Sequence, residues 1–522
     1  MSGSGTQISA DLRYKKLVAG VLLMASIVLA ALFAWNSVQA LSAKGPFWFE
    51  GVVLGFINNM QLGRLYQLDA LQSEPYSVLT HTPLSYLLGY GAYSLFPGYG
   101  SLRLVNIVLA AGCALLVANL SRLEYRQEGI GGWRSVHWFA AGIFLVSPAV
   151  FFWSQVARST DTLACLFSLA ALTALVGLPP SLRREVTIGV FWALAVLSKQ
   201  SSAVVLAPVL LGYDVLFARE RSRPIWRLLA WRLLFCGVVL LPVFGYLQWS
   251  TRGGFLHNVI GGNVVDASAE WWLVIVEKIK DWWVMCLIVV ALGGLQRSAT
   301  SLWFVSGLAF GLIGVAKRGA DINYFFDASA ALAILAAGVI VRAPQWRRLP
   351  LALAAILLAV LAMCWSDRGR MVSAAGDRGY ASMIAWLSSY TGGKGQVLSD
   401  DAGIPVALGQ NPVMDDPFVF AEWAKRGTWN DNAIVEALRR GKYAAVVVSS
   451  IEPLWSPAMR REIARSYALV RVFPSTAPLP RCVYVPLAAL ATSTGPRLEP
   501  YVPTAEDKRG LSCYPPEPPR SN

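Results

Sequence analysis

Long apolar runs alternate with short polar segments along the first two-thirds of the chain. Most runs have the length that crosses a hydrocarbon core of about 30 Å as a single helix. This pattern predicts a polytopic α-helical membrane protein with about 11 spans. The predicted spans cover residues 17–41, 101–120, 136–153, 162–178, 186–198, 201–217, 232–249, 282–296, 301–316, 324–341 and 349–365.

A cleaved signal peptide is the competing interpretation of the first run, because its segment Ser37-Val38-Gln39-Ala40 has a small-residue end. The length of the run exceeds the apolar region of a signal peptide, which favours an uncleaved span. The next segment, 42–100, is polar and aromatic, and its apolar stretch 83–96 is short for a span. We therefore interpret 42–100 as one outer loop, with 83–96 along the membrane surface. This choice puts the Arg-rich loops 121–135 and 218–227 in the cytoplasm, together with the N-terminus.

The pattern changes after the last span. Short β-like runs occur at 395–400, 443–450, 468–473 and 482–487, with a helical pattern at 430–443. Alternating strands and helices predict a small extracytoplasmic α/β domain over residues 367–490, following a membrane domain of residues 1–366. The Pro-rich tail 491–522 is expected to be disordered.

Composition supports the membrane class. The chain is 55% hydrophobic and 15% charged, with a mean hydropathy of +0.50, whereas a soluble protein carries about a quarter charged residues. The net charge of +14 lies in short loops, so it indicates topology and not a nucleic-acid partner. The three His residues are too far apart in sequence to suggest a zinc site. Cys482 and Cys513 lie in the polar C-terminal part, and the sequence leaves open whether they pair.

The predicted topology gathers charged residues at the outer membrane face, where charge is costly and usually functional. Two carboxylates could act as a general base and its partner, or bind one divalent cation, and the basic residues would suit a phosphate. The residues concerned are Glu50, Arg158, Asp161, Lys199, Lys317 and Arg318.

Each of these residues also has a purely structural interpretation. Glu50 could be a solvated loop acid. Asp161 could cap the helix that follows it or pair locally with Arg158. Lys199 could extend to the lipid headgroups. Lys317 and Arg318 break the positive-inside trend, so topology explains them least well.

The order of these elements resembles one known group of enzymes. The first outer loop has Glu50, a Gly-x-x-Tyr element at 63–66, a Pro-Leu-x-Tyr element at 83–86 and Arg103-Leu104. Further matches follow at Arg158 to Asp161, 194–208 and 323–333 and in the C-terminal domain. The whole chain thus resembles the membrane glycosyltransferases with the C-type fold, specifically the bacterial relatives of dolichyl-phosphate-mannose protein mannosyltransferases and aminoarabinose transferases. Many members have an Asp-Glu pair in the first loop, where this chain has Phe49 before Glu50.

The resemblance implies an enzyme of the cell (inner) membrane, a hexosyl- or pentosyltransferase. Such an enzyme moves a sugar from a polyprenyl phosphate, with inversion, to an extracytoplasmic acceptor that is a glycan, a lipid or a protein. By this resemblance Glu50 and Asp161 are the catalytic candidates, with Glu50 the base or its organiser, and both would share any divalent cation. Lys199, Lys317 and Arg318 would bind the lipid phosphate. Arg158, His81 and Tyr324 are the further candidate substrate contacts.

Two other classes of protein would also have many spans with charged residues. A transporter or flippase of a lipid-linked glycan more often has internal repeats and charges at mid-depth, whereas here the charges lie at one face. An inactive scaffold whose outer domain binds a partner would not need Glu50 and Asp161.

Overall fold

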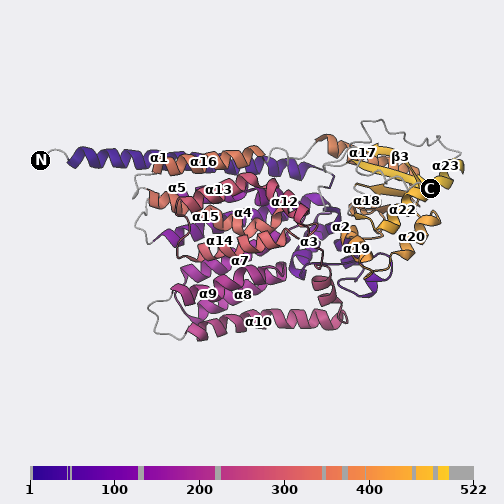
Figure 1. Ribbon diagram of the computed structural model, residues 1–522, viewed down its shortest axis with the longest axis horizontal. Helices are drawn as coiled ribbons and strands as arrows, with labels where there is room; N and C mark the ends of the chain where they lie inside the picture. The colour runs from indigo at the N-terminus through magenta and orange to yellow at the C-terminus, as the bar shows by residue number, and fades with distance from the viewer. Residues whose placement is uncertain are drawn as a thin grey trace.

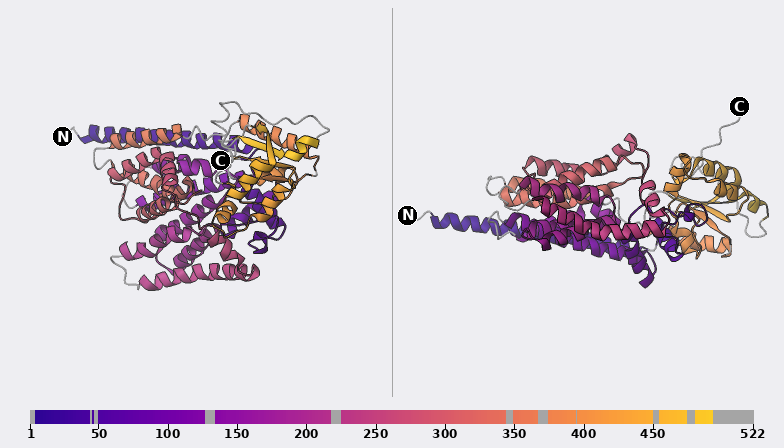
Figure 2. Two further views of the ribbon diagram at one scale, coloured as in Figure 1. Left: turned by 45° about the vertical axis from the view of Figure 1, so that its right-hand side comes forward. Right: turned by 90° about the horizontal axis from the view of Figure 1, so that it is seen from below.

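The computed structural model describes residues 4–43, 45–46, 50–126, 134–217, 225–343, 349–366, 374–393, 395–449, 454–473 and 480–492. Long helices lie side by side in a bundle, and an α/β domain lies at one end of it (Figure 1). Figure 2 shows the same arrangement from two further directions. Phe49 and residues 493–522, including Cys513 and most of the predicted tail, lie outside the described residues.

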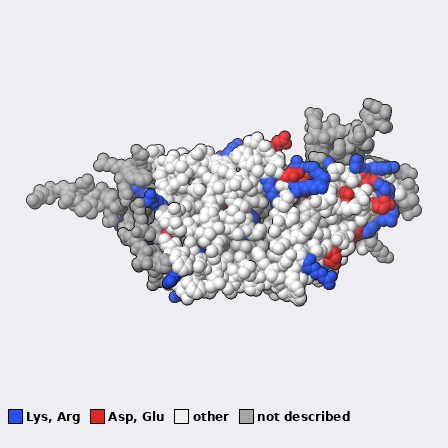
Figure 3. Space-filling model, turned by 60° about the horizontal axis from the view of Figure 1, so that its bottom comes forward, with Lys and Arg blue, Asp and Glu red and all other residues white. Residues whose placement is uncertain are grey.

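Each predicted span lies on a helix of the bundle, and five helices of the described residues are long and apolar enough to cross a membrane. The number of crossings stays a prediction. The helices are α1 (Ser4–Ser42), α4 (Tyr99–Tyr125), α5 (Arg134–Val146) with α6 (Pro148–Trp153), α7 (Thr160–Gly177), α8 (Leu182–Ser198), α9 (Ser202–Phe217), α10 (Ile225–Ser250), α13 (Lys280–Ala291), α14 (Ala299–Gly314), α15 (Phe326–Arg342) and α16 (Leu349–Ser366). Figure 3 shows few charged side chains over the bundle and many over the α/β domain.

Helix α15 lies at the centre of the bundle because its side chains are small. It is rich in alanine and almost wholly buried. A Cβ at Gly307 of α14 would lie 3.1 Å from the Ala328 nitrogen of α15, so glycine lets these two helices approach closely. By contrast, α10 lies at the edge, with most of its apolar surface exposed.

A buried charge network joins three helices of the bundle. Arg184 and Glu185 of α8, Asp214 of α9 and Arg232 of α10 are at most 1% exposed. Arg184 and Arg232 both donate to Asp214 Oδ2, at 3.0 and 2.8 Å, and both also pair with Glu185. Two positive and two negative groups therefore compensate each other within the membrane domain.

The segments predicted as outer loops hold shorter helices. The first contains α2 (Glu50–Gln61), η1 (Asp69–Leu71) and α3 (Pro83–Leu95). Pro83 is favourable at the start of α3, since its fixed φ suits a first turn. The 13 residues of α3 are too few to span a membrane, as expected for 83–96. The loop after α10 holds α11 (Gly254–Leu256), η3 (His257–Gly261) and α12 (Ala269–Lys278), and η4 (Ile322–Phe325) precedes α15.

The α/β prediction is confirmed, since each β-like run contains a strand. Strands β1 (Val397–Ser399), β2 (Ala445–Val448), β3 (Tyr467–Phe473) and β4 (Arg481–Pro486) form one sheet in the order β1-β2-β4-β3. β1 and β2 are parallel and the other two pairs are antiparallel. The helices are α17 (Ala374–Thr391), α18 (Gly403–Ala407), α19 (Pro417–Lys425), α20 (Asn432–Arg439), α22 (Pro457–Ser466) and α23 (Leu487–Thr492). Cys482 of β4 is disulfide-bonded.

Helix α2 docks on the α/β domain through two glycines one turn apart. A Cβ at Gly51 would lie 1.6 Å from Asp401 Oδ1, and one at Gly55 would lie 2.8 Å from the Asp415 Cβ. Asp415 is fully buried and accepts hydrogen bonds from the Val78 nitrogen (3.1 Å) and from Ser77. The α/β domain is therefore fixed to the first outer loop at several points.

Candidate functional site

Glu50 is a buried residue, which makes the solvated-acid interpretation wrong. It begins α2, is 1% exposed, and accepts a hydrogen bond from Arg103 Nε of α4 at 2.9 Å. Its Oε1 also accepts from the Ala157 nitrogen at 2.6 Å. Arg103 in addition donates to three backbone carbonyls at the end of α1 and just beyond it, those of Ala40, Ala43 and Gly45. Glu50 thus connects α2, α4 and the segment that precedes α7.

Arg158 follows directly after the segment that Glu50 holds. Its guanidinium donates to Nε2 of His81, a residue of the first outer loop that is 7% exposed. Arg158 therefore reaches across to His81, which is not the local pairing with Asp161 considered from sequence. The main chain beside His81 is also fixed, since Gln200 Nε2 (2.8 Å) and the Asn263 side chain both donate to the Thr80 carbonyl.

Asp161 and Lys199 form a buried ion pair at the start of α7 and the end of α8. They are 4% and 7% exposed, and the Lys199 Nζ donates to Asp161 Oδ1. Asn323 donates to the other oxygen, Oδ2, at 3.0 Å. The ring of Tyr324 lies 4.8 Å from the Lys199 Nζ, within cation–π range. The helix-capping interpretation of Asp161 is wrong, since Ser159 occupies the cap position of α7.

Gly314 makes room for this arrangement. A Cβ at Gly314 would lie 2.2 Å from Tyr324 Cδ1 and 2.6 Å from Cε1. The ring can therefore lie against the end of α14 and beside Lys199 only because the residue there is glycine.

Lys317 brings a third cation to the same place. Its Nζ donates to Asn263 Oδ1 at 3.0 Å, and Asn263 is the residue that also bonds Thr80. Burial, and then the charge of Arg158, lower the pKa of Lys317 from its ordinary value to about 8. Burial also lowers the pKa of His81 well below its usual range, with Arg158, Lys199 and Lys317 acting in the same direction. We call Arg158, Lys199, Lys317 and His81 the cation cluster.

The α/β domain adds Asp416 to this site, a residue that the sequence analysis did not select. Asp416 accepts a hydrogen bond from the Val419 nitrogen (3.3 Å) and so caps α19. Burial raises the pKa of its carboxyl, while the positive charges of Arg158 and Lys317 oppose that rise. The adjacent pair Asp415-Asp416 was the available sequence signal. Asn263, Asn323 and Gln200 were likewise missed, because lone amides in outer loops have no distinguishing pattern.

Several buried polar atoms at the cation cluster form no hydrogen bond of good geometry with the residues that the structure describes, although His81 lies near Gln200 and Tyr86 lies near Thr80. These atoms are His81 Nδ1, the Tyr86 hydroxyl and Gln200 Oε1. Buried polar atoms are nearly always satisfied, so such a group at one place indicates a site that a ligand or water completes.

The structure thus brings most of the predicted site residues together. Asp161, Lys199 and Tyr324 are in direct contact, and so are Arg158 and His81. Lys317 lies near enough for its positive charge to lower the pKa of His81. Arg318 differs, because its guanidinium pairs with Glu422 of α19 at 3.6 Å and is 38% exposed.

The carboxylates do not fit a shared metal ion. Glu50 bonds Arg103 and the Ala157 nitrogen, and Asp161 bonds Lys199 and Asn323, so each carboxylate already has its own cation. Within the described ranges, no group of three or more His, Cys, Asp or Glu residues is placed to hold a metal.

Comparisons with known proteins identify the architecture. No family model and no curated protein sequence matches the chain. Solved structures do match. ArnT from Cupriavidus metallidurans in the apo state has a TM-score of 0.61 at 14% identity, covering 90% of this chain and 98% of that one. ArnT bound to undecaprenyl phosphate has a TM-score of 0.60 at 13% identity, with coverages of 91% and 99%.

An archaeal protein of known structure is also similar to this chain. The Archaeoglobus fulgidus oligosaccharyltransferase in complex with zinc and sulfate has a TM-score of 0.50 at 12% identity, covering 88% of this chain and 75% of that one. Identities this low establish the fold alone. The chain has the C-type fold of membrane glycosyltransferases, with a small α/β domain after the membrane helices.

Proposed function

We propose that the protein is an integral membrane glycosyltransferase, a hexosyl- or pentosyltransferase that uses a polyprenyl-phosphate sugar. The acceptor oxygen bonds to the anomeric carbon with inversion while the bond from that carbon to the phosphate oxygen breaks. The electron pair leaves with the phosphate, and the hydroxyl proton passes to a base. The fold supports this proposal, and the ArnT of similar structure binds undecaprenyl phosphate.

The observation that carries the proposal is the cation cluster at the junction of the bundle with the α/β domain. Burial and the charges of Arg158 and Lys199 lower the pKa of Lys317, and Asp416 offsets them only in part, so an added anion would stabilise the cluster. A lipid phosphate would relieve this repulsion, and it would gain charge as the sugar departs. Groups fixed around that phosphate stabilise the transition state more than the ground state.

The contacts suggest different roles for the carboxylates. Glu50 accepts bonds from Arg103 and Ala157, so we assign it the organiser's role, holding Arg158 in position through the preceding residue. Asp161 orients Lys199 and Asn323. Burial raises the pKa of the Asp416 carboxyl and so makes its carboxylate more basic, and we propose it as the group that takes the acceptor proton.

Arg318 positions other residues of the site. Its pair with Glu422 joins the loop after α14 to α19, the helix that Asp416 caps. In the same loop, a Cβ at Gly319 would lie 2.5 Å from Phe418. Arg318 thus aligns Asp416 with Lys317 without touching the phosphate itself.

The orientation in the membrane is part of the proposal. Five segments form the site and meet the α/β domain or one another at one end of the bundle: 50–98, 154–161, 199–201, 257–268 and 315–325. We place this end outside the cell (inner) membrane and the N-terminus in the cytoplasm. The domain limits 1–366 and 367–490 are proposed with it.

The test measures donor binding and sugar transfer by the full chain in membranes. The Lys199→Gln variant removes a charge-assisted contact, so its affinity for undecaprenyl phosphate should fall about 10- to 100-fold, with transfer from labelled polyprenyl-phosphate sugar falling as well. The exposed Lys280, changed to Gln, is the matched control. Unchanged affinity in Lys199→Gln contradicts the phosphate site. Donor binding with translocation but no glycosyl product in the wild type would instead support the transporter.

A further inference from the structure

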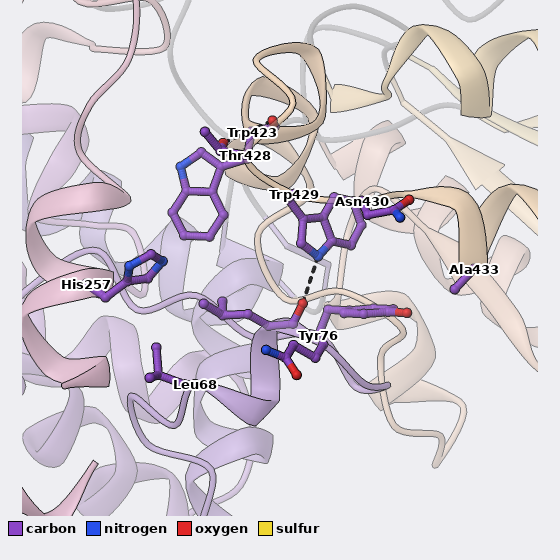
Figure 4. A pocket seen from close by; sticks show the side chains of 10 residues that line it. Leu68, Tyr76, His257, Trp423, Thr428, Trp429, Asn430 and Ala433 are labelled. Carbon is purple, nitrogen blue, oxygen red and sulfur yellow. Dashed lines mark hydrogen bonds between the residues drawn. The ribbon is translucent and has the colours of Figure 1, made fainter. Parts of the chain in front are cut away.

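A pocket of about 500 Å³ lies between the first outer loop and the α/β domain, beside the proposed reaction site (Figure 4). This volume falls in the range of small-molecule sites. The loop contributes one wall and the region around α19 the other, with η3 between them. Its lining residues are Leu68, Leu71, Gln72, Tyr76, His257, Trp423, Thr428, Trp429, Asn430 and Ala433.

The lining combines an aromatic floor with a neutral polar rim. Trp423, Trp429 and Tyr76 are mostly buried, while the rim side chains Gln72 and Asn430 are exposed. The residues that line the pocket include no Asp, Glu, Lys or Arg. An occupant of this pocket would therefore offer apolar faces together with uncharged hydrogen-bonding groups.

The aromatic side chains are held in fixed orientations. The indole nitrogen of Trp429 donates to the Leu71 carbonyl at 2.8 Å, and that of Trp423 donates to the Gly261 carbonyl at 3.3 Å. His257 lies with its ring 5.7 Å from the Trp423 ring. Figure 4 shows these rings around the cavity. Rings fixed in this way present preformed surfaces and lose little conformational freedom on binding.

The pocket is connected to the cation cluster through η3. This element is a single turn of π-helix, a form often found at functional sites. His257 at its start lines the pocket, and Gly261 at its end accepts from Trp423. Two residues later, Asn263 accepts from Lys317. One short segment thus forms a wall of the pocket and also positions a proposed phosphate ligand.

We propose that this pocket binds a saccharide unit of the acceptor, an inference that rests on the proposed glycosyltransferase function. Sugar rings have C–H faces that pack on the negative face of aromatic rings and hydroxyls that pair with amides. A peptide that adds a strand would need an exposed sheet edge, and no strand residue lines this pocket. An acyl chain would leave the polar rim unused. The acceptor that these features favour is a neutral glycan.

The test uses the full chain in nanodiscs and removes two rim groups together. The variant is Gln72→Ala with Asn430→Ala, and the matched control is Gln61→Ala with Asn411→Ala, which replaces exposed residues of the same types outside the pocket. The probe is a mixture of oligosaccharides released by mild acid from the source organism's envelope and digested with protease. Retained carbohydrate is measured after acid hydrolysis, and folding is checked by the thermal unfolding midpoint.

We expect the wild type and the control to retain the oligosaccharides. The rim variant should retain at least about tenfold less carbohydrate at an unchanged unfolding midpoint. Periodate treatment of the probe should abolish retention. Equal retention by variant and control overturns the inference, as does no retention by the wild type. Retention only before protease digestion also overturns it, in favour of a peptide. A wild type that binds undecaprenyl phosphate but no glycan refutes this pocket alone. One that binds no undecaprenyl phosphate refutes the proposed function.

Discussion

At the scale of single residues, the site depends on which charges are compensated and which are not. Glu50 and Arg103 form a closed pair inside the protein, whereas the charged neighbours of Lys317 are the two cations Arg158 and Lys199 together with one carboxylate, Asp416. Burial makes both arrangements costly to disturb, and in the second it lowers the pKa of Lys317 to about 8.

The deprotonation of Lys317 should therefore lower the activity of the enzyme at basic pH. Its pKa is lowered to about 8, so it loses its proton, and with it attraction for the phosphate, as the pH rises through 8. We expect kcat/KM for the donor to fall above pH 8, because this parameter reports groups of the free enzyme. In Lys317→Arg the charge persists and the fall should move to higher pH. The exposed Lys280→Arg is the control, and an unshifted profile in Lys317→Arg would contradict the assignment.

The proposed roles of Glu50 and Asp416 should be distinguishable by the stability of their variants. Glu50→Gln leaves Arg103 buried beside a neutral partner, so we expect a loss of about 3–5 kcal/mol of stability together with activity. Asp416→Asn keeps a good helix-capping residue, so kcat should fall about 10²- to 10⁴-fold at an unchanged unfolding midpoint. Steady-state transfer and thermal unfolding of both variants decide this. Full activity in Asp416→Asn would refute its role as base.

At the scale of elements, glycine residues allow helices to pack closely against other parts of the chain. The sequence around Glu50 could be recognised as an outer-loop element, but its docking surface could not, because Gly51 and Gly55 acquire meaning only once Asp401 and Asp415 lie against them. Those partners are some 350 residues away, and hydrophobic periodicity reports only local burial.

Gly51→Ala should therefore weaken the docking of the α/β domain. The new Cβ would lie 1.6 Å from Asp401 Oδ1 and 2.7 Å from the Gly403 backbone nitrogen, and backbone cannot move aside cheaply. We expect faster proteolysis between α16 and α17 and reduced transfer. Gly91→Ala in α3, where a Cβ meets nothing within 4 Å, is the control. Equal cleavage rates for the two variants would show that α2 does not fix the domain.

At the scale of the whole molecule, the sequence predicts the general architecture but not the pairings within it. The spans and strands follow from run length and alternation, which each segment carries by itself. The partners of Glu50, Asp161 and Arg318 lie on other elements, so only the packed structure identifies them. The buried network of α8, α9 and α10 could not be predicted for the same reason. Its charged residues lie close to loops whose positive charge is accounted for by the positive-inside rule.

That network should fix the edge helix α10 to the bundle. Asp214→Asn leaves two buried guanidinium groups with one carboxylate, so we expect stability to fall by about 3–5 kcal/mol. Thermal unfolding in detergent would measure this loss. Asp69→Asn is the control, since that residue is exposed in η1. A midpoint equal to that of the control would show that the network contributes nothing to stability.

The docking of the α/β domain has a consequence for biosynthesis. Asp416, Glu422 and Trp423 belong to a part of the chain that the ribosome makes after the membrane helices, and they complete a site whose other parts are made first. A nascent chain still passing through the insertion machinery therefore has the cations but neither the proposed base nor the saccharide pocket. With the proposed roles of these residues, glycosyl transfer becomes possible only when the last domain has folded onto the bundle, so the order of synthesis itself delays activity until assembly is finished.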